Sequence, residues 1–143
     1  MHVYPAGAAV HTLQLDNDIQ NELTEMQQKG IDVNELLRQF LQKRKTEIEE
    51  KKSEISKMQT QEREERAVIG MPAKRYIPAT VRHILKAEFG TLCSAKGCTH
   101  KAENLHHEQG FAKTQHHDPK FIKPLCRAHH ELAHLRTGNA PLR

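Results

Sequence analysis

The chain contains no tryptophan and few other aromatic residues, two Tyr and four Phe among 143 residues. Its length allows one ordinary domain, or two small ones joined by a stalk. It lacks any run approaching about 18 consecutive apolar residues, which excludes a membrane-spanning helix. The N-terminal stretch has no charged segment ahead of a hydrophobic one, so we expect no secretory signal.

Cysteine is also scarce, with three residues, whereas histidine is abundant, with eleven. Few thiols beside many imidazoles are typical of a chain that binds a metal rather than one held by disulfides. We therefore expect an intracellular protein, in the cytoplasm, whose cysteines coordinate a metal ion.

Charge divides the chain into two halves. Residues 1–70 carry 10 Lys and Arg against 13 Asp and Glu, a net charge of −3, whereas residues 71–143 carry 12 against 5, a net charge of +7. All three cysteines and nine of the histidines lie in the basic half. This asymmetry favours a polyanionic partner for the second half, although a basic surface that serves only solubility gives the same count.

The first 42 residues predict a short strand and two helices. Residues 10–15 alternate apolar and polar side chains, as a strand does. Apolar residues at helical spacing after Asp16 predict a helix that ends at Gly30. Asp32 or Asn34 can cap the next helix, which has a strong apolar face. That face consists of Val33, Leu36, Leu37, Phe40 and Leu41.

Residues 43–66 predict a long charged helix, because 15 of these 24 residues are charged and none is Gly or Pro. Apolar residues recur every seven positions at Leu41, Ile48 and Ile55, but charged residues interrupt the companion positions. The helix could pair with a copy of itself as a short coiled coil, or stand alone in solvent. We assign residues 43–70 to this stalk.

The order strand, helix, glycine turn, helix over residues 10–42 resembles the ribbon-helix-helix family of dimeric DNA-binding proteins. That resemblance implies that the outward strand side chains Thr12 and Gln14 enter the major groove. The strand carries no Lys or Arg and this half is acidic, which opposes phosphate binding. We therefore favour a role in homodimerisation for residues 1–42, with a two-helix hairpin lacking a partner as the alternative.

The second half, residues 71–143, contains the residues that suggest chemistry. The apolar spacing of TVRHILKAEF predicts an amphipathic helix that ends at Gly90. Two closely spaced ligand pairs follow, and a structural zinc ion takes four such ligands. These ligands are Cys93, Cys98, Cys126 and His129.

Four further histidines surround these ligands. His130 and His134 are four residues apart, so both rings lie on one face of a helix and can hold a single ion. His106 and His107 are adjacent, so in an extended segment they point in different directions. One of them can then bind the ion while the other acts as a general base, a division of labour that suits phosphodiester hydrolysis. The alternative is a set of surface or core histidines.

The stretch from residue 75 to 134 resembles the HNH endonuclease family, the ββα-metal nucleases, in its zinc-braced form. The motifs that carry the resemblance are Cys-x4-Cys, Leu-His-His at 105–107 and Leu-Cys-x-x-His-His at 125–130. The resemblance implies a β-hairpin followed by a helix, a DNA substrate and a catalytic divalent ion such as Mg²⁺ or Mn²⁺ beside the structural Zn²⁺. By this resemblance His106, His130 and His134 bind the catalytic ion, and His107 is the general base.

The chain departs from the family pattern where an Asn usually precedes the final Leu-Cys, because it has Phe121 to Pro124 there. His117 and Asp118 are the candidates to replace that Asn. Asp118 could accept the second ring N–H of the base and so set its tautomer, which is the catalytic role we assign to it. Alternatively, the sequence HHDP forms only a turn.

We expect DNA phosphates to be contacted by basic residues spread over the second half, with little sequence preference. The principal candidates are Arg75, Arg82, Lys113, Lys123 and Arg127.

The sequence thus predicts an α+β, mostly helical fold and a metal-dependent DNA endonuclease. The alternatives are a catalytically silent, zinc-stabilised DNA-binding regulator with a ribbon-helix-helix-like dimer, and a protein-interaction module.

Overall fold

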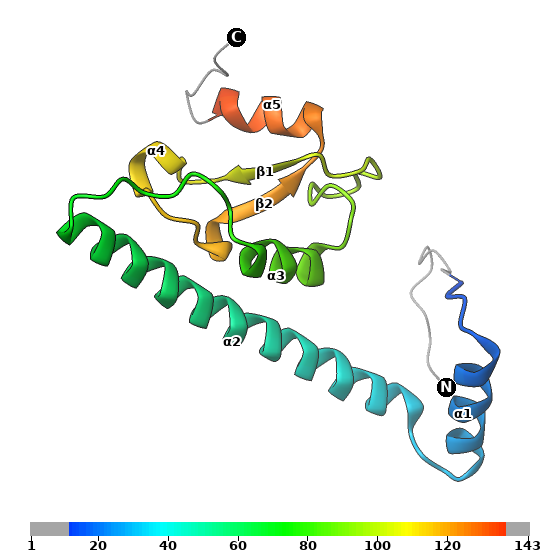
Figure 1. Ribbon diagram of the computed structural model, residues 1–143. Coiled ribbons are helices and arrows are strands. Elements are labelled where there is room, and N and C mark those ends of the chain that lie inside the picture. Colours follow the sequence, from blue (N-terminus) through cyan, green and yellow to red (C-terminus); the bar gives the residue numbers. More distant parts are fainter. Residues whose placement is uncertain (1–11, 137–143) are drawn as a thin grey trace. The chain divides into compact units, whose positions relative to one another are not determined.

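The computed structural model describes residues 12–136, which form helices and one two-stranded sheet (Figure 1). The expected α+β, mostly helical composition is confirmed. The chain divides into two compact units, residues 1–42 and residues 43–143. Over the described stretch, no helix is both long and apolar enough to cross a bilayer. The elements in order are α1 (Asn17–Gln28), α2 (Val33–Val68), α3 (Ala79–Phe89), β1 (Asn104–His107), α4 (Phe111–Thr114), η1 (Pro119–Phe121), β2 (Ile122–Leu125) and α5 (Arg127–Arg136).

The first unit contains α1 and the start of α2, as the apolar spacing predicts. Gly30 follows α1 with a positive φ of 83°, a conformation that glycine adopts without strain. Asp32 Oδ1 accepts a hydrogen bond from the backbone N–H of Glu35 at 3.1 Å, so Asp32 rather than Asn34 caps α2. Several large apolar side chains of this unit are exposed to solvent, including Leu37, Phe40 and Leu41.

The predicted strand over residues 10–15 is wrong for its described part. Residues 12–15 form no strand, while residues 10 and 11 lie outside the described range. A strand needs a partner backbone for its hydrogen bonds, and within residues 12–136 the sheet consists of β1 and β2 alone. Alternation over so few residues does not supply that partner.

The stalk helix does not stand free, because its part within the second unit packs on α3. Ile48 is buried in a core cluster with Val81, Ile84 and Leu85 of α3, and Ile55 packs against the same cluster. Two of the apolar positions that suggested a coiled-coil seam, Ile48 and Ile55, are therefore covered within the chain, whereas the third, Leu41, is exposed. Apolar residues at a regular spacing on a helix predict that one face is buried, but they do not predict which element covers that face.

Polar contacts fix α2 against α3 as well. Lys52, though charged, is buried, and its Nζ lies 2.9 Å from Glu88 Oε2 on α3. Arg44 donates a hydrogen bond to the carbonyl oxygen of Ala87 near the end of α3. The Lys52–Glu88 ion pair had a signal in the sequence. Lys52 lies between Ile48 and Ile55 on one helical face, which is the face that α3 covers.

The C-terminal half of α2 also supports the loop between β1 and β2. Ser56 Oγ donates to Asp118 Oδ2 at 2.8 Å, and Arg63 donates to the carbonyl oxygen of Thr114 at 3.0 Å. These bonds hold the segment that contains His116 and His117 against the helix.

The sheet pairs β1 and β2 in antiparallel fashion, and α5 follows β2 directly. The register places His106 opposite Lys123 and His107 opposite Ile122. Since neighbouring strand residues face opposite sides of a sheet, His106 and His107 point in different directions, as expected. Figure 1 shows α3 and α5 on opposite sides of the strands.

Replacing Ile48 by alanine tests the packing of α2 on α3. We expect Ile48→Ala to lower the free energy of unfolding by about 2–4 kcal/mol, because it leaves a cavity in the core. Met58→Ala, on the same helix at a side chain that is 64% exposed, should change it by less than about 0.5 kcal/mol. Urea denaturation measures both, and equal effects would contradict this packing.

Candidate metal centres

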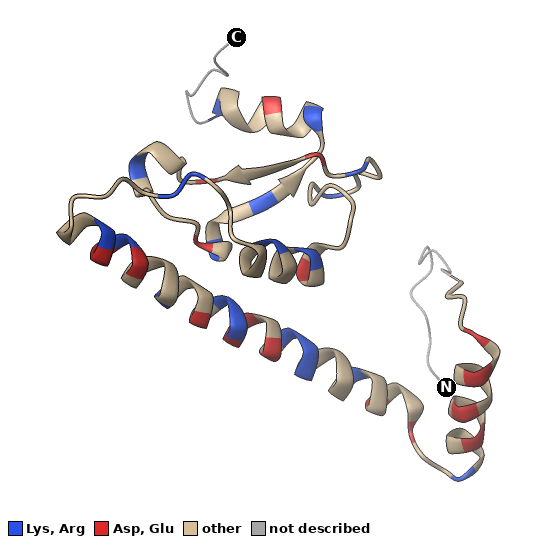
Figure 2. Cartoon of the chain, in the orientation of Figure 1, with Lys and Arg blue, Asp and Glu red and all other residues tan. Residues whose placement is uncertain are grey.

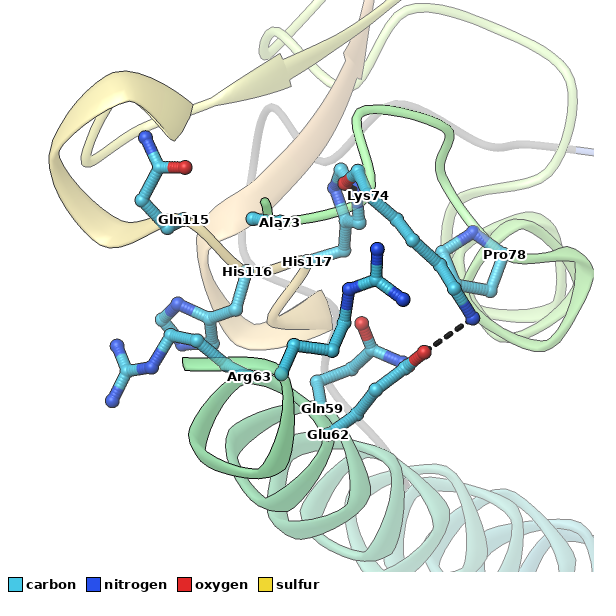
Figure 3. A pocket seen from close by; sticks show the side chains of 10 residues that line it. Gln59, Glu62, Arg63, Ala73, Lys74, Pro78, Gln115, His116 and His117 are labelled. Atoms are coloured by element: carbon cyan, nitrogen blue, oxygen red, sulfur yellow. Dashed lines mark hydrogen bonds and ion pairs between the residues drawn. The ribbon is translucent and has the colours of Figure 1, made fainter. Parts of the chain in front are cut away.

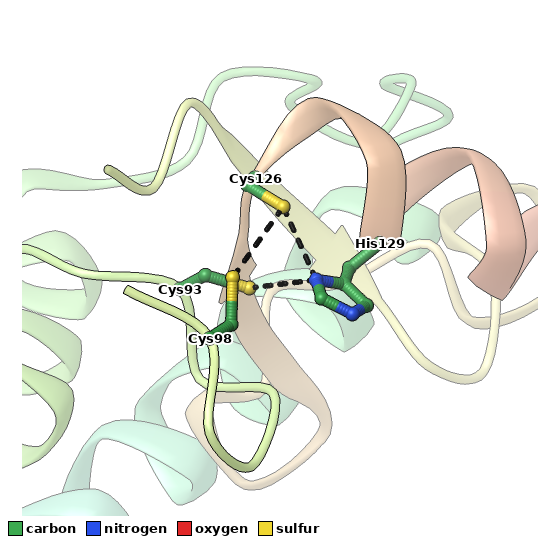
Figure 4. Close-up of side chains that lie close together, drawn as sticks. All are labelled: Cys93, Cys98, Cys126 and His129. Carbon is green, nitrogen blue, oxygen red and sulfur yellow. Dashed lines mark hydrogen bonds between the residues drawn. The ribbon is translucent and has the colours of Figure 1, made fainter. Parts of the chain in front are cut away.

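Three cysteines and one histidine from separate parts of the second unit converge on one point (Figure 4). Cys93 and Cys98 lie on the loop after α3, Cys126 follows β2, and His129 lies in the first turn of α5. The loop turns back at Gly97, whose φ is 78°, and Cys98 N–H donates to the Ala95 carbonyl at 3.0 Å. We call these four residues the Cys3His cluster.

The spacing within the Cys3His cluster suits a single tetrahedral ion. His129 Nδ1 lies 3.2 Å from Cys126 Sγ and 3.5 Å from Cys93 Sγ, and Cys98 Sγ lies 3.9 Å from Cys126 Sγ. A tetrahedral ion with zinc-like bond lengths separates two sulfurs by about 3.8 Å, and a sulfur from a nitrogen by about 3.6 Å. The cluster is therefore compatible with a bound metal ion such as zinc.

Electrostatics favour the thiolate form at one cysteine of the Cys3His cluster, Cys93. At Cys98 the backbone N–H of His100 lowers the pKa, but burial and the neighbouring Cys93 and Cys126 outweigh it and raise the pKa. Burial on its own raises the pKa of the Cys93 thiol, but hydrogen bonds from the backbone at Cys126 and Ala95 and from the neighbouring thiols outweigh it. The net effect lowers the pKa of Cys93 to about 7. A thiol that ionises near neutral pH is a ready metal ligand.

A second group of ligand atoms belongs to His106 on β1 and to His130 and His134 on α5, whose ring nitrogens lie within 4.8 Å of one another. We call it the three-histidine cluster. The Nε2 atoms of His130 and His134 are 3.0 Å apart, which is close to the spacing of neighbouring nitrogen ligands on one ion with bonds of about 2.1 Å. The sequence placed these two on one helical face, and the structure brings His106 to them.

Burial favours the neutral form of two rings in the three-histidine cluster, those of His106 and His130. Burial lowers the pKa of His106, and the charges of His134 and His130 lower it further. Burial and the charge of His134 lower the pKa of His130 in the same way. Neutral imidazole is the form that coordinates a metal, so His106 and His130 hold their ligand form at neutral pH.

His107, the predicted general base, contacts a second histidine. Its Nε2 lies 2.9 Å from Nδ1 of His117. Burial lowers the pKa of His107 to about 4, with smaller effects from the charges of His117, His106 and His116. His107 is half-buried, whereas His117 is 2% exposed.

The assignment of Asp118 as the partner of the base differs from what the structure shows. Asp118 Oδ1 accepts the backbone N–H of Lys120 at 2.9 Å and so caps η1, while Oδ2 accepts from Ser56. His117 is the residue that contacts His107. The alternative prediction, that HHDP forms only a turn, therefore applies to Asp118. A carboxylate at the start of a turn accepts hydrogen bonds from nearby backbone N–H groups, as Asp118 does from Lys120.

Lys and Arg are spread over several elements (Figure 2), and four of the five predicted DNA-binding residues lie on four different ones, α3, α4, β2 and α5. Of the five, only Lys123 lies beside the three-histidine cluster, where it lines a cavity of about 330 Å³ together with His106 and Arg136. Lys123 Nζ also pairs with Glu108 at 2.8 Å. Arg127 pairs with Glu131, the Arg82 guanidinium lies over the Tyr76 ring, and Arg75 and Lys113 are exposed.

Comparison with protein-family models, with curated proteins and with solved structures finds no match to this chain.

Metal binding by the Cys3His cluster can be tested with cobalt, whose thiolate complexes absorb strongly. We expect one equivalent of Co²⁺ to give a sulfur-to-cobalt charge-transfer band, displaced by Zn²⁺. His129→Ala should weaken this binding by more than about 10-fold, the scale seen when even an outer-shell partner is lost.

His83→Ala is the matched control. His83 is an exposed histidine on α3 and is not a member of the cluster. Absence of the band in the unaltered protein, or equal weakening by both substitutions, would contradict the ligand set.

Proposed function

We propose that the second unit is a metal-dependent endonuclease of the HNH type that hydrolyses DNA phosphodiester bonds. The observation that carries the proposal is the convergence of His106 from β1 with His130 and His134 from α5, next to a His107 whose ring is held by another histidine. The order strand, strand, helix, with the Cys3His cluster joining the ends, agrees with the sequence resemblance to that family.

The donor set of the three-histidine cluster fits a borderline divalent metal. It offers three imidazole nitrogens and no carboxylate. Imidazole suits ions such as Mn²⁺, Ni²⁺ or Zn²⁺, whereas Mg²⁺ prefers oxygen ligands. Such an ion would supply positive charge at the scissile phosphate and at the leaving oxygen. The Cys3His cluster, with three thiolates, is proposed to hold a structural zinc.

His107 is proposed to be the general base. A neutral imidazole takes the proton of a water molecule as the water oxygen attacks phosphorus, and the bond from phosphorus to the leaving oxygen breaks. The lowered pKa of His107 keeps its ring neutral at pH 7. Lys123 and Arg136 beside His106 provide cationic contacts for the flanking phosphates.

The first unit is proposed to pair two copies of the chain. Its exposed apolar side chains include Leu13, Ile19, Leu36, Leu37, Phe40 and Leu41. Leu36, Leu37, Phe40 and Leu41 follow one another within six residues of α2, and exposed apolar groups that lie close together mark interaction sites. Paired copies would offer two active sites to the two DNA strands. Light scattering over a range of concentrations measures the mass that decides this point.

Cleavage of supercoiled plasmid tests the nuclease. Mild chelation is followed by addition of Mn²⁺, Ni²⁺ or Mg²⁺, with the zinc content measured in parallel. We expect nicking that depends on the added ion and is weakest with Mg²⁺. His107→Ala should reduce the rate by about 10²- to 10⁴-fold, the contribution of a general base.

His83→Ala is the matched control, because His83 is an exposed histidine on α3. It should cleave at the rate of the unaltered protein. Cleavage by His107→Ala at that same rate would overturn the assignment of the base. Salt-sensitive DNA binding without cleavage by any ion would instead support the catalytically silent regulator.

A further inference from the structure

His117 is among the most deeply buried side chains of the second unit, and each of its two ring nitrogens has a hydrogen-bond partner. It is 2% exposed, its Nδ1 lies 2.9 Å from His107 Nε2, and its Nε2 lies 2.8 Å from the carbonyl oxygen of Lys74. Its ring also stacks on Phe111, with centroids 4.8 Å apart and planes 8° apart. Two hydrogen bonds and one stacking contact therefore hold the ring of His117 in position.

The partners of His117 determine where its proton lies. The Lys74 carbonyl oxygen only accepts hydrogen bonds, so Nε2 of His117 must carry the hydrogen. In a neutral imidazole the other nitrogen, Nδ1, then has a lone pair and accepts. The hydrogen of the bond between the two rings therefore belongs to His107 Nε2, and His107 Nδ1 is left with its lone pair.

His117 stays neutral because of its surroundings. Burial lowers its pKa, and the charge of His116 acts in the same direction, against opposing effects from the Lys74 carbonyl and from Glu62. A doubly protonated His117 would direct an N–H at His107 and reverse the tautomer of that ring.

We infer that His117 is a positioning residue that holds His107 in the tautomer whose Nδ1 is free to accept a proton. The inference rests on the proposed function, in which His107 is the general base. His117 acts through His107 and not on the substrate.

A small cavity lies beside His117, between α2 and the segment before α3 (Figure 3). Its volume of about 20 Å³ leaves room for about one water molecule.

Two substitutions separate the two hydrogen bonds of His117. An asparagine carries its side-chain oxygen near the position of Nδ1 and can still accept from His107. A glutamine carries its amide near the position of Nε2 and retains only the bond to the Lys74 carbonyl. We expect His117→Asn to cleave plasmid within about 5-fold of the unaltered protein, and His117→Gln to lose about 10²- to 10⁴-fold, the scale observed when a catalytic histidine adopts the wrong tautomer.

Nitrogen-15 NMR of histidine-labelled, zinc-loaded protein gives a readout that needs no activity. We expect the His107 ring to carry its hydrogen on Nε2 in the unaltered protein and in His117→Asn, and to lose that preference in His117→Gln. If the unaltered protein shows the hydrogen on Nδ1 of His107, the inference is overturned even where the variants fail to fold. Equal loss of cleavage in two folded variants would also overturn it.

The same spectra distinguish failure of the inference from failure of the proposed function. The expected tautomer in a protein that cleaves no DNA would leave the positioning of His107 intact and remove the nuclease.

Discussion

The position of α5 on the sheet depends on the Cys3His cluster. No residue of α5 is fully buried, and the small core next to it consists largely of the ligands themselves, Cys93 and Cys126 together with Leu125. With so little apolar material next to α5, ligand bonds to one ion would provide the stabilisation that hydrophobic packing provides elsewhere. His129 belongs to the Cys3His cluster and lies one residue before His130 on α5. Because His129 fixes the start of α5, His130 and His134 on the same helix lie next to His106.

A second constraint comes from α2, which supports the opposite side of the second unit. Its apolar positions pack on α3, and its polar side chains bond the loop between β1 and β2 through Asp118 and Thr114. That loop carries His117, which in turn contacts His107. The two histidines of β1 are thus held from different sides, His106 near α5 and His107 near the loop.

Local spacing was enough to predict α1, α3 and the ligand pairs Cys93–Cys98, Cys126–His129 and His130–His134, because side chains three to five residues apart can meet on one turn or one helical face. The membership of His106 came from the family resemblance, since it lies 24 residues before His130. The element that packs on α2 could not be predicted, since an apolar helical face does not indicate which element covers it. The burial of Lys52 was missed for the same reason, because its partner Glu88 belongs to that covering helix. The choice between His117 and Asp118 was wrong for a related cause. Side-chain direction in a loop depends on distant contacts, here with Ser56 and Lys74.

The central proposal is that one small unit holds two chemically different metal ions. X-ray absorption at the zinc and manganese edges, on protein loaded with one ion of each, tests this most directly. Zinc should show three sulfurs at about 2.3 Å and one nitrogen at about 2.0–2.1 Å, while manganese should show imidazole nitrogens and no sulfur. A zinc shell without sulfur, or manganese surrounded by water oxygens alone, would contradict it.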